Sequence, residues 1–78
     1  MNPKERAHTQ FAVCIRNADN PASLEMRKLY PVLPDTNAAA HGMLRVIDES
    51  GEDYLYPADD FLVLSLSYDV EQALLKAS

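Results

Sequence analysis

The 78-residue chain has one cysteine, Cys14, and no tryptophan, and no apolar run approaches the length needed to span a membrane. One cysteine cannot form an internal disulfide, and it fits a reducing compartment. The first ten residues, MNPKERAHTQ, hold no apolar segment of the kind found in a secretory signal. We therefore expect a single-domain cytoplasmic protein that does not enter a membrane.

Residues suited to catalysis or to metal binding are also scarce. Cys14 lies in the apolar run FAVCI, which is typical of a buried strand, and neither His8 nor His41 is spaced as a base beside it. One cysteine and two distant histidines form no CxxC or HxxxH pair. The sequence therefore predicts no enzyme, no metal site and no cofactor.

Basic residues are few: seven Lys and Arg stand against twelve Asp and Glu, which gives a net charge of -5. Binding to phosphate backbones depends on Lys and Arg that displace counterions. Nucleic acid is therefore not expected as the main partner, and other proteins are favoured. A small nucleic-acid-binding barrel remains the alternative, with candidate contacts Arg16, Arg27, Lys28 and Arg45.

What the chain does contain is a series of short apolar segments separated by turn residues. We expect five strands, at 11–16, within 23–35, and at 43–48, 54–57 and 61–66. Pro31 cannot donate a ladder hydrogen bond, so the second strand should lie at a sheet edge or carry a bulge.

Turn and cap residues punctuate these strands. Asp35 or Thr36 can cap a short helical turn over 36–42, which Gly42 would end in the left-handed conformation. Gly51 can supply the positive φ that a tight hairpin needs. These signals separate the second, third and fourth strands.

The order of elements predicts an all-β protein, a small five-stranded antiparallel barrel with a short C-terminal helix. We expect a flexible arm over 1–9, the barrel over 10–67 and the helix over 68–78, with Asp69 as N-cap and Gln72 completing a capping box. A helix this short is marginal in isolation, so it should pack on the barrel or on a partner.

The segments SLEMRKLYPVLPD and HGMLRVIDESGEDYLYPADDF resemble those of a group of small, largely uncharacterised bacterial proteins, which carry SLE-x-x-K-x-Y-x-VLPD and RVIDESGEDYLYPA segments. The resemblance implies a barrel similar to Src-homology-3 (SH3) domains. Peptide-binding barrels of that type line a polyproline groove with aromatic rings and a proline, which Pro57 matches. Asp60 replaces their tyrosine and tryptophan is missing, so polyproline binding is not carried over.

Tyr54 and Tyr56 lie two residues apart on one expected strand, so their side chains share a face, with Leu55 opposite. If Leu55 faces the core, the tyrosines lie on the outside in a patch of a kind enriched at protein interfaces. The alternative is that the rings pack under loops or the C-terminal helix, with only their hydroxyls in water. The candidate binding residues of this aromatic patch are Tyr30, Tyr54, Tyr56, Pro57 and Phe61.

Carboxylates gather around the expected hairpin and after it, at Asp48, Glu49, Glu52, Asp53, Asp59 and Asp60. A metal or catalytic pair is one interpretation, but the calcium-loop spacing is missing. A solvated acidic rim is favoured, because Asp and Ser are preferred beside glycine in turns. We expect Arg45 to pair with a turn acid such as Asp53, and Lys28 to do likewise.

The sequence thus predicts a non-catalytic protein-interaction module whose partner is an unidentified protein or a second copy of the chain. An edge strand carrying Pro31 and a marginal apolar helix would each leave surface that another chain can cover.

Overall fold

The computed structural model describes residues 10–77, so the flexible arm expected over 1–9 lies outside the described residues. The strands are β1 (Gln10–Cys14), β2 (Leu29–Leu33), β3 (Met43–Ile47), β4 (Asp53–Pro57) and β5 (Phe61–Leu64). The helical elements are α2 (Thr36–Ala40), the 3₁₀ turn η1 (Ala58–Asp60) and α3 (Tyr68–Lys76). Each expected strand is present, within a few residues of its predicted bounds.

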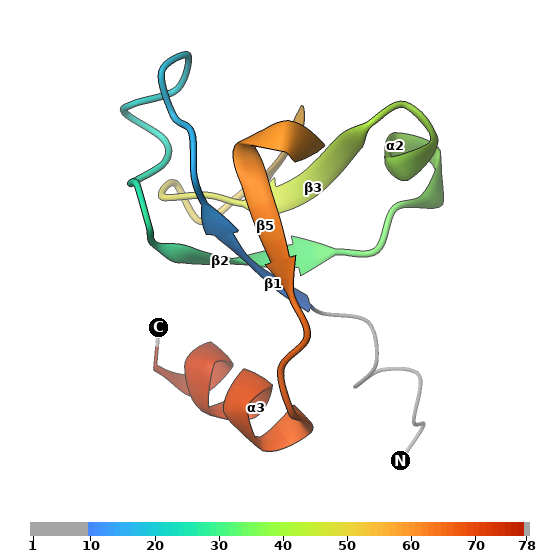
Figure 1. Ribbon diagram of the computed structural model, residues 1–78. Coiled ribbons are helices and arrows are strands. Elements are labelled where there is room, and N and C mark those ends of the chain that lie inside the picture. The colour runs from blue at the N-terminus through green and yellow to red at the C-terminus, as the bar shows by residue number, and fades with distance from the viewer. Residues whose placement is uncertain (1–9, 78) are drawn as a thin grey trace.

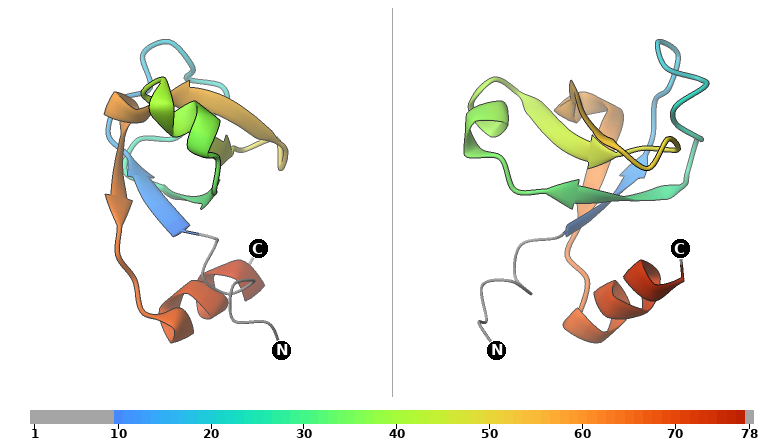
Figure 2. Two further views of the ribbon diagram at one scale, coloured as in Figure 1. Left: turned by 90° about the vertical axis from the view of Figure 1, so that its right-hand side faces the viewer. Right: turned by 180° about the vertical axis from the view of Figure 1, so that it is seen from behind.

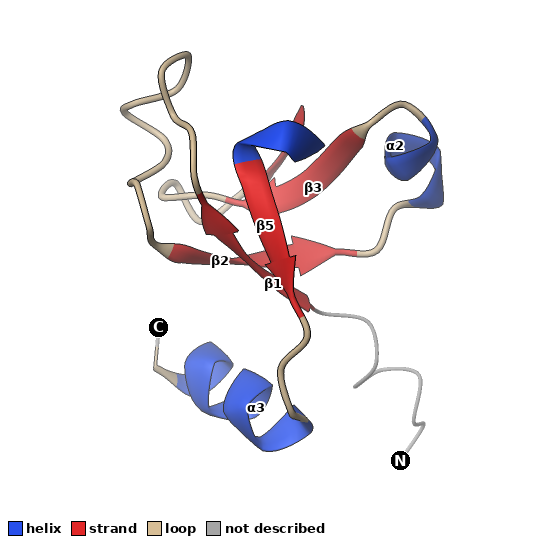
Figure 3. Ribbon diagram, viewed as in Figure 1, coloured by secondary structure: helices blue, strands red, loops and turns tan. Residues whose placement is uncertain are grey.

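All five strands form one antiparallel sheet in the order β4-β3-β2-β1-β5. β1 and β5 lie side by side and run across the direction of β2 and β3, so the sheet curls into a half-barrel (Figure 1). Strands make up most of the regular structure, and the helices are short (Figure 3). The predicted all-β, SH3-like barrel with a short C-terminal helix is confirmed.

The concave face of the half-barrel holds the main apolar core. Period-two alternation directs every second side chain of each strand inward. Cys14 is fully buried there, as the sequence predicts, and the rings of Tyr56 and Phe61 meet edge to face with centroids 6.1 Å apart. The members of this core are Ala12, Cys14, Leu24, Tyr30, Val32, Val46, Tyr56 and Phe61, with Leu44 packed against them.

Pro31 does not mark an edge strand. β2 is the central strand of the sheet, so the prediction of an edge position is wrong. The ladder between β2 and β3 begins at Val32, which pairs with Val46, so Pro31 lies just outside this ladder. A residue without an N–H is accommodated where this ladder has not yet begun.

The connections use the predicted turn chemistry. Asp35 is the N-cap of α2, and its Oδ1 accepts a hydrogen bond from the Ala38 N–H at 2.9 Å. Gly42 and Gly51 both have positive φ, 71° and 83°, as expected for the residues that end α2 and turn the β3–β4 hairpin. The β2–β3 and β3–β4 connections are therefore encoded locally.

The C-terminal helix begins differently from the prediction. Its N-cap is Ser67, whose hydroxyl accepts a hydrogen bond from the Val70 N–H at 3.3 Å, so the prediction of Asp69 as N-cap is wrong. Asp69 lies instead in the first turn, where a negative charge suits the helix dipole. Neither α3 nor any other helix among residues 10–77 is long and apolar enough to cross a membrane.

Helix α3 is set apart from the barrel. It has no fully buried residue and packs closely against no other regular element of residues 10–77. Both views in Figure 2 show it below the barrel, joined to it by the segment that follows β5.

Candidate functional site

The convex face of the half-barrel is apolar over three neighbouring strands. Residues paired directly in an antiparallel ladder point to the same face of the sheet. The β5–β1–β2 registers therefore place two apolar rows on the convex face. The first row is Leu64, Phe11 and Pro31, and the second is Leu62, Val13 and Leu29.

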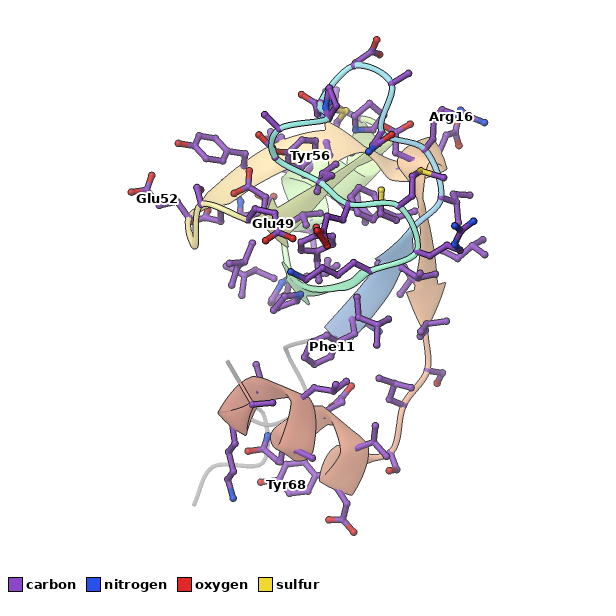
Figure 4. All side chains as sticks on the ribbon, turned by 90° about the vertical axis from the view of Figure 1, so that its left-hand side faces the viewer. Phe11, Arg16, Glu49, Glu52, Tyr56 and Tyr68 are labelled. Atoms are coloured by element: carbon purple, nitrogen blue, oxygen red, sulfur yellow. The ribbon has the colours of Figure 1, made fainter. Side chains whose placement is uncertain are left out.

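An apolar convex face is unusual for an antiparallel sheet, which commonly presents polar residues on the side away from the core. Leu62 is 55% exposed, whereas Phe11 is only 3% exposed although it lies outside the main core. The Phe11 side chain points from β1 toward α3 (Figure 4). The convex face is therefore covered in one place and open in another.

A cavity of about 600 Å³ lies between this face and the C-terminal helix, and we call it the α3 groove. Its large apolar lining side chains are Phe11, Leu29, Pro31, Ile47, Leu74 and Leu75. The end near the β3–β4 hairpin is polar, with Lys28, Asp48 and Glu49 in the lining. Its size lies within the range of ordinary ligand pockets.

Glu49 ties the hairpin end of the groove to β2. Its carboxylate pairs with Lys28 Nζ at 2.6 Å and accepts a hydrogen bond from the Tyr30 hydroxyl. The Tyr30 oxygen in turn accepts from the Glu25 N–H at 2.7 Å. The Lys28 and Tyr30 donors hold the pKa of Glu49 below its usual value, and burial raises the pKa of Tyr30. This end is therefore a connected polar network.

Asp48 forms a second, more buried network at the same hairpin. Its Oδ2 accepts from the Tyr56 hydroxyl at 2.5 Å, and its Oδ1 accepts from the Ser50 hydroxyl at 2.6 Å. Burial opposes ionisation of Asp48, but the Ser50 and Tyr56 donors outweigh it, so its pKa lies below the ordinary value. Among residues 10–77, no buried side-chain nitrogen or oxygen lacks a hydrogen-bond partner.

The candidate aromatic patch is not an exposed surface. Three of its members are buried, so their predicted position on the outer side is wrong: Tyr30, Tyr56 and Phe61. The alternative of packed rings holds for the two tyrosines, but their hydroxyls donate to Glu49 and Asp48 instead of lying in water. Tyr56 fills the concave side, so Leu55 points outward instead.

Two residues of the candidate patch remain accessible. Tyr54 is 50% exposed and its hydroxyl donates to Glu52 at 3.1 Å, while Pro57 is exposed at the end of β4. With the other rings buried, they do not make an aromatic surface. Whether Tyr54 and Pro57 contact a partner stays a prediction.

Arg45 joins two acids across the convex side of β3 and β4. Its Nε donates to Asp35 Oδ2 at 2.8 Å, and its Nη1 donates to Asp53 Oδ2 at 3.0 Å. The predicted pairing with Asp53 is confirmed, and Asp35 adds a link to the cap of α2. The Ala38 N–H and the Arg45 guanidinium keep the pKa of Asp35 below its usual value.

The other candidate nucleic-acid contacts do not form one patch with Arg45. Lys28 is held by Glu49, which confirms its expected pairing with a turn acid. Arg16 Nη1 lies 3.9 Å from Asp60 Oδ1, and Arg27 is exposed with a positive φ of 65°. Three of the four cations therefore already have a carboxylate partner.

The acidic rim is only partly solvated. Asp48 and Asp60 are buried, so the expectation of a solvated rim is wrong for these two, because each is turned toward hydrogen-bond or charge partners. The exposed members are Glu49, Glu52, Asp53 and Asp59. Within residues 10–77, no group of three or more His, Cys, Asp or Glu side chains is arranged to hold a metal ion.

The groove residues were not identified as a site from the sequence, although a signal is present. FAVC in β1 and FLVL in β5 are apolar at every position rather than at alternate ones. Such strands need cover on both faces, whereas a half-exposed strand alternates apolar and polar residues. The pattern could have pointed to a second covered face, but not to the position of α3.

Comparisons with protein-family models, with curated proteins and with solved structures found no match for the chain. The function of the chain is therefore inferred from the geometry and chemistry of the α3 groove.

Proposed function

We propose that this chain is a protein-interaction module without catalytic activity of its own, and that the α3 groove is its contact surface. The observation that carries the proposal is the apolar convex face of β5, β1 and β2, from which α3 stands off across a cavity of about 600 Å³. Apolar faces of this kind mark interaction sites in soluble proteins.

The energetics favour an occupant that brings apolar side chains. Complete burial of one leucine side chain is worth roughly 1.5–3 kcal/mol relative to exposure. A helix as short as α3 gains stability mainly from packing, and in the described chain it has little. A partner segment in the groove would cover the convex face and α3 at the same time.

The resemblance of the SLEMRKLYPVLPD and RVIDESGEDYLYPA segments to small bacterial proteins supports a bacterial setting for this module, and its single cysteine fits the reducing environment of a cytoplasm. A nucleic-acid-binding barrel has weaker support, because Arg16, Lys28 and Arg45 already face carboxylates. Among the four candidate cations, only Arg27 has no carboxylate partner within residues 10–77, and one free cation is little to hold a phosphate backbone.

Photo-crosslinking in the native cells tests the proposal. A photoreactive phenylalanine analogue replaces Leu29 or Leu74 on the two walls of the groove, and Leu55 serves as the matched control. Leu55 is an exposed leucine on the convex side of β4, outside the groove. Irradiation should give the same discrete, heavier protein adduct from both groove positions and not from Leu55. No protein adduct, or equal adducts from all three positions, would contradict the proposal.

A further inference from the structure

The charges at the α3 groove are predominantly negative. At the hairpin end, Lys28 and Glu49 neutralise each other, and the remaining acid, Asp48, is buried with both carboxylate oxygens hydrogen-bonded within the chain. On the helix side, Glu71 lies three and four residues before the groove-lining Leu74 and Leu75, a spacing that puts all three on one helix face. Glu71 is half-buried and forms no ion pair within residues 10–77. The helix side of the groove therefore favours a cation.

The charge of the whole chain acts in the same direction. A net charge of -5 attracts cationic partners and repels anionic ones. A second copy of the chain would bring the same acids to the same surface, and nucleic acids or anionic membranes would bring further negative charge. Among macromolecular occupants, a protein segment that carries Lys or Arg has the complementary charge.

The shape of the groove limits what part of a partner can enter. A cavity of about 600 Å³ with one open side takes several large side chains but not a folded domain. An amphipathic helix places apolar side chains at i, i+3, i+4 and i+7 along one face and basic side chains beside them. Laid next to α3, such a helix would complete a helical layer over the convex face of the sheet.

We propose that the α3 groove binds a basic amphipathic helix of a partner protein, whose apolar face meets Leu29 and Leu74. Its Lys or Arg side chains lie beside Glu71. This inference rests on the proposed function, because it names the kind of segment that fills the same groove.

Fluorescence anisotropy with synthetic peptides and the full 78-residue chain tests the inference. The probe is a labelled amphipathic peptide of leucine and lysine, about 14 residues long so that it can form a helix. One matched peptide has glutamate in place of lysine, and another has serine in place of leucine. The leucine–lysine peptide should bind saturably and more weakly as salt is raised, and the other two should bind at least about tenfold more weakly.

Charge variants separate the groove from the general acidity of the chain. Glu71→Lys should raise the Kd of the leucine–lysine peptide by about fivefold to tenfold, and Glu71→Gln by about twofold to fivefold. Asp59→Lys makes the same charge change on exposed η1, at the opposite end of β5 from α3 (Figure 1), and should change Kd by less than about twofold. Circular dichroism melts check that each variant is folded. If Glu71→Lys does not fold, the comparison of Glu71→Gln with the parent chain decides the test.

The outcomes distinguish this inference from the proposed function. Equal losses from Glu71→Lys and Asp59→Lys would overturn the inference, because binding would then follow bulk charge. Stronger binding of the glutamate peptide, or a dimer in sedimentation that excludes the lysine peptide, would also overturn it. In another outcome, the photo-crosslinks form from the groove positions while the leucine–lysine peptide fails to bind. That result would support the groove as a protein-interaction surface and would overturn the proposal of a basic helix as its occupant.

Discussion

The hydroxyl of Tyr56 donates a hydrogen bond to Asp48 Oδ2 at 2.5 Å and so joins the middle of β4 to the end of β3. Both residues are buried, and the carboxylate also accepts from Ser50. The bond connects the core of the half-barrel to the hairpin that forms one end of the α3 groove.

Removing that hydroxyl should destabilise the protein measurably. Tyr56→Phe keeps the ring but leaves the buried Asp48 carboxylate with one donor fewer, which should cost about 1.5–3 kcal/mol. Tyr54→Phe is the matched control, because the Tyr54 hydroxyl donates to Glu52 at the surface. Urea unfolding should show a lower midpoint for Tyr56→Phe and no measurable change for Tyr54→Phe. Equal midpoints for the two variants would mean that the Asp48 bond contributes nothing.

The stability of the fold should fall in acid. The pKa values of Asp48 and Glu49 lie below their ordinary values of 3.8 and 4.5, because both carboxylates accept hydrogen bonds in the folded state. A group with a depressed folded-state pKa stabilises the protein above its unfolded-state pKa, and this stability is lost as pH falls through the folded-state value. Thermal melts should therefore be level near neutral pH and drop below about pH 4.5.

A variant isolates the part of this pH dependence that belongs to Asp48. Asp48→Asn cannot ionise, so it should melt at a lower temperature near neutral pH and lose less stability than the parent on acidification. The same steep acid drop in Asp48→Asn would show that other carboxylates are responsible.

Arg27 should be a site where glycine stabilises the protein. Its φ of 65° lies in the left-handed region, which costs a residue with a Cβ roughly 1–2 kcal/mol. Glycine avoids that strain but loses more entropy on folding, so Arg27→Gly should gain about 0.5–1 kcal/mol. Arg27→Ala removes the same charge and keeps the Cβ, so its melting temperature should not rise. A gain of equal size in Arg27→Ala would point to charge rather than backbone strain.

Asp35 has two separable roles, as N-cap of α2 and as partner of Arg45. Asparagine caps a helix about as well as aspartate but carries no charge. Alanine can neither cap the helix nor pair with Arg45. Asp35→Asn should therefore lower the melting temperature slightly, and Asp35→Ala should lower it more. If the two variants melt together well below the parent, the ion pair with Arg45 is the dominant role.

Much of this architecture follows from local signals in the sequence. Gly42, Gly51 and Asp35 occupy the turn and cap positions that their chemistry predicts, and the five apolar segments became the five strands. The capping residue of α3 was less certain to predict, because Ser67 and Asp69 are both good N-cap residues two positions apart. Only the path of the chain out of β5 decides between them.

The face of each side chain was harder to predict than its strand. Alternation shows that Tyr54 and Tyr56 share a face, but it does not show which face is concave when Leu55 is apolar as well. The same ambiguity concealed Phe11, because both sides of β1 are apolar. The α3 groove depends on where a separate helix lies, and no local pattern specifies that position.

Amide chemical-shift mapping shows most directly whether a protein segment occupies the α3 groove. The ¹⁵N-labelled chain is titrated with the partner segment identified by photo-crosslinking at Leu74. The largest shifts should cluster at Phe11, Leu29 and Leu74, with little change at Asp59 on η1. Shifts that cluster away from the groove, or no shifts at saturation, would contradict binding in the groove.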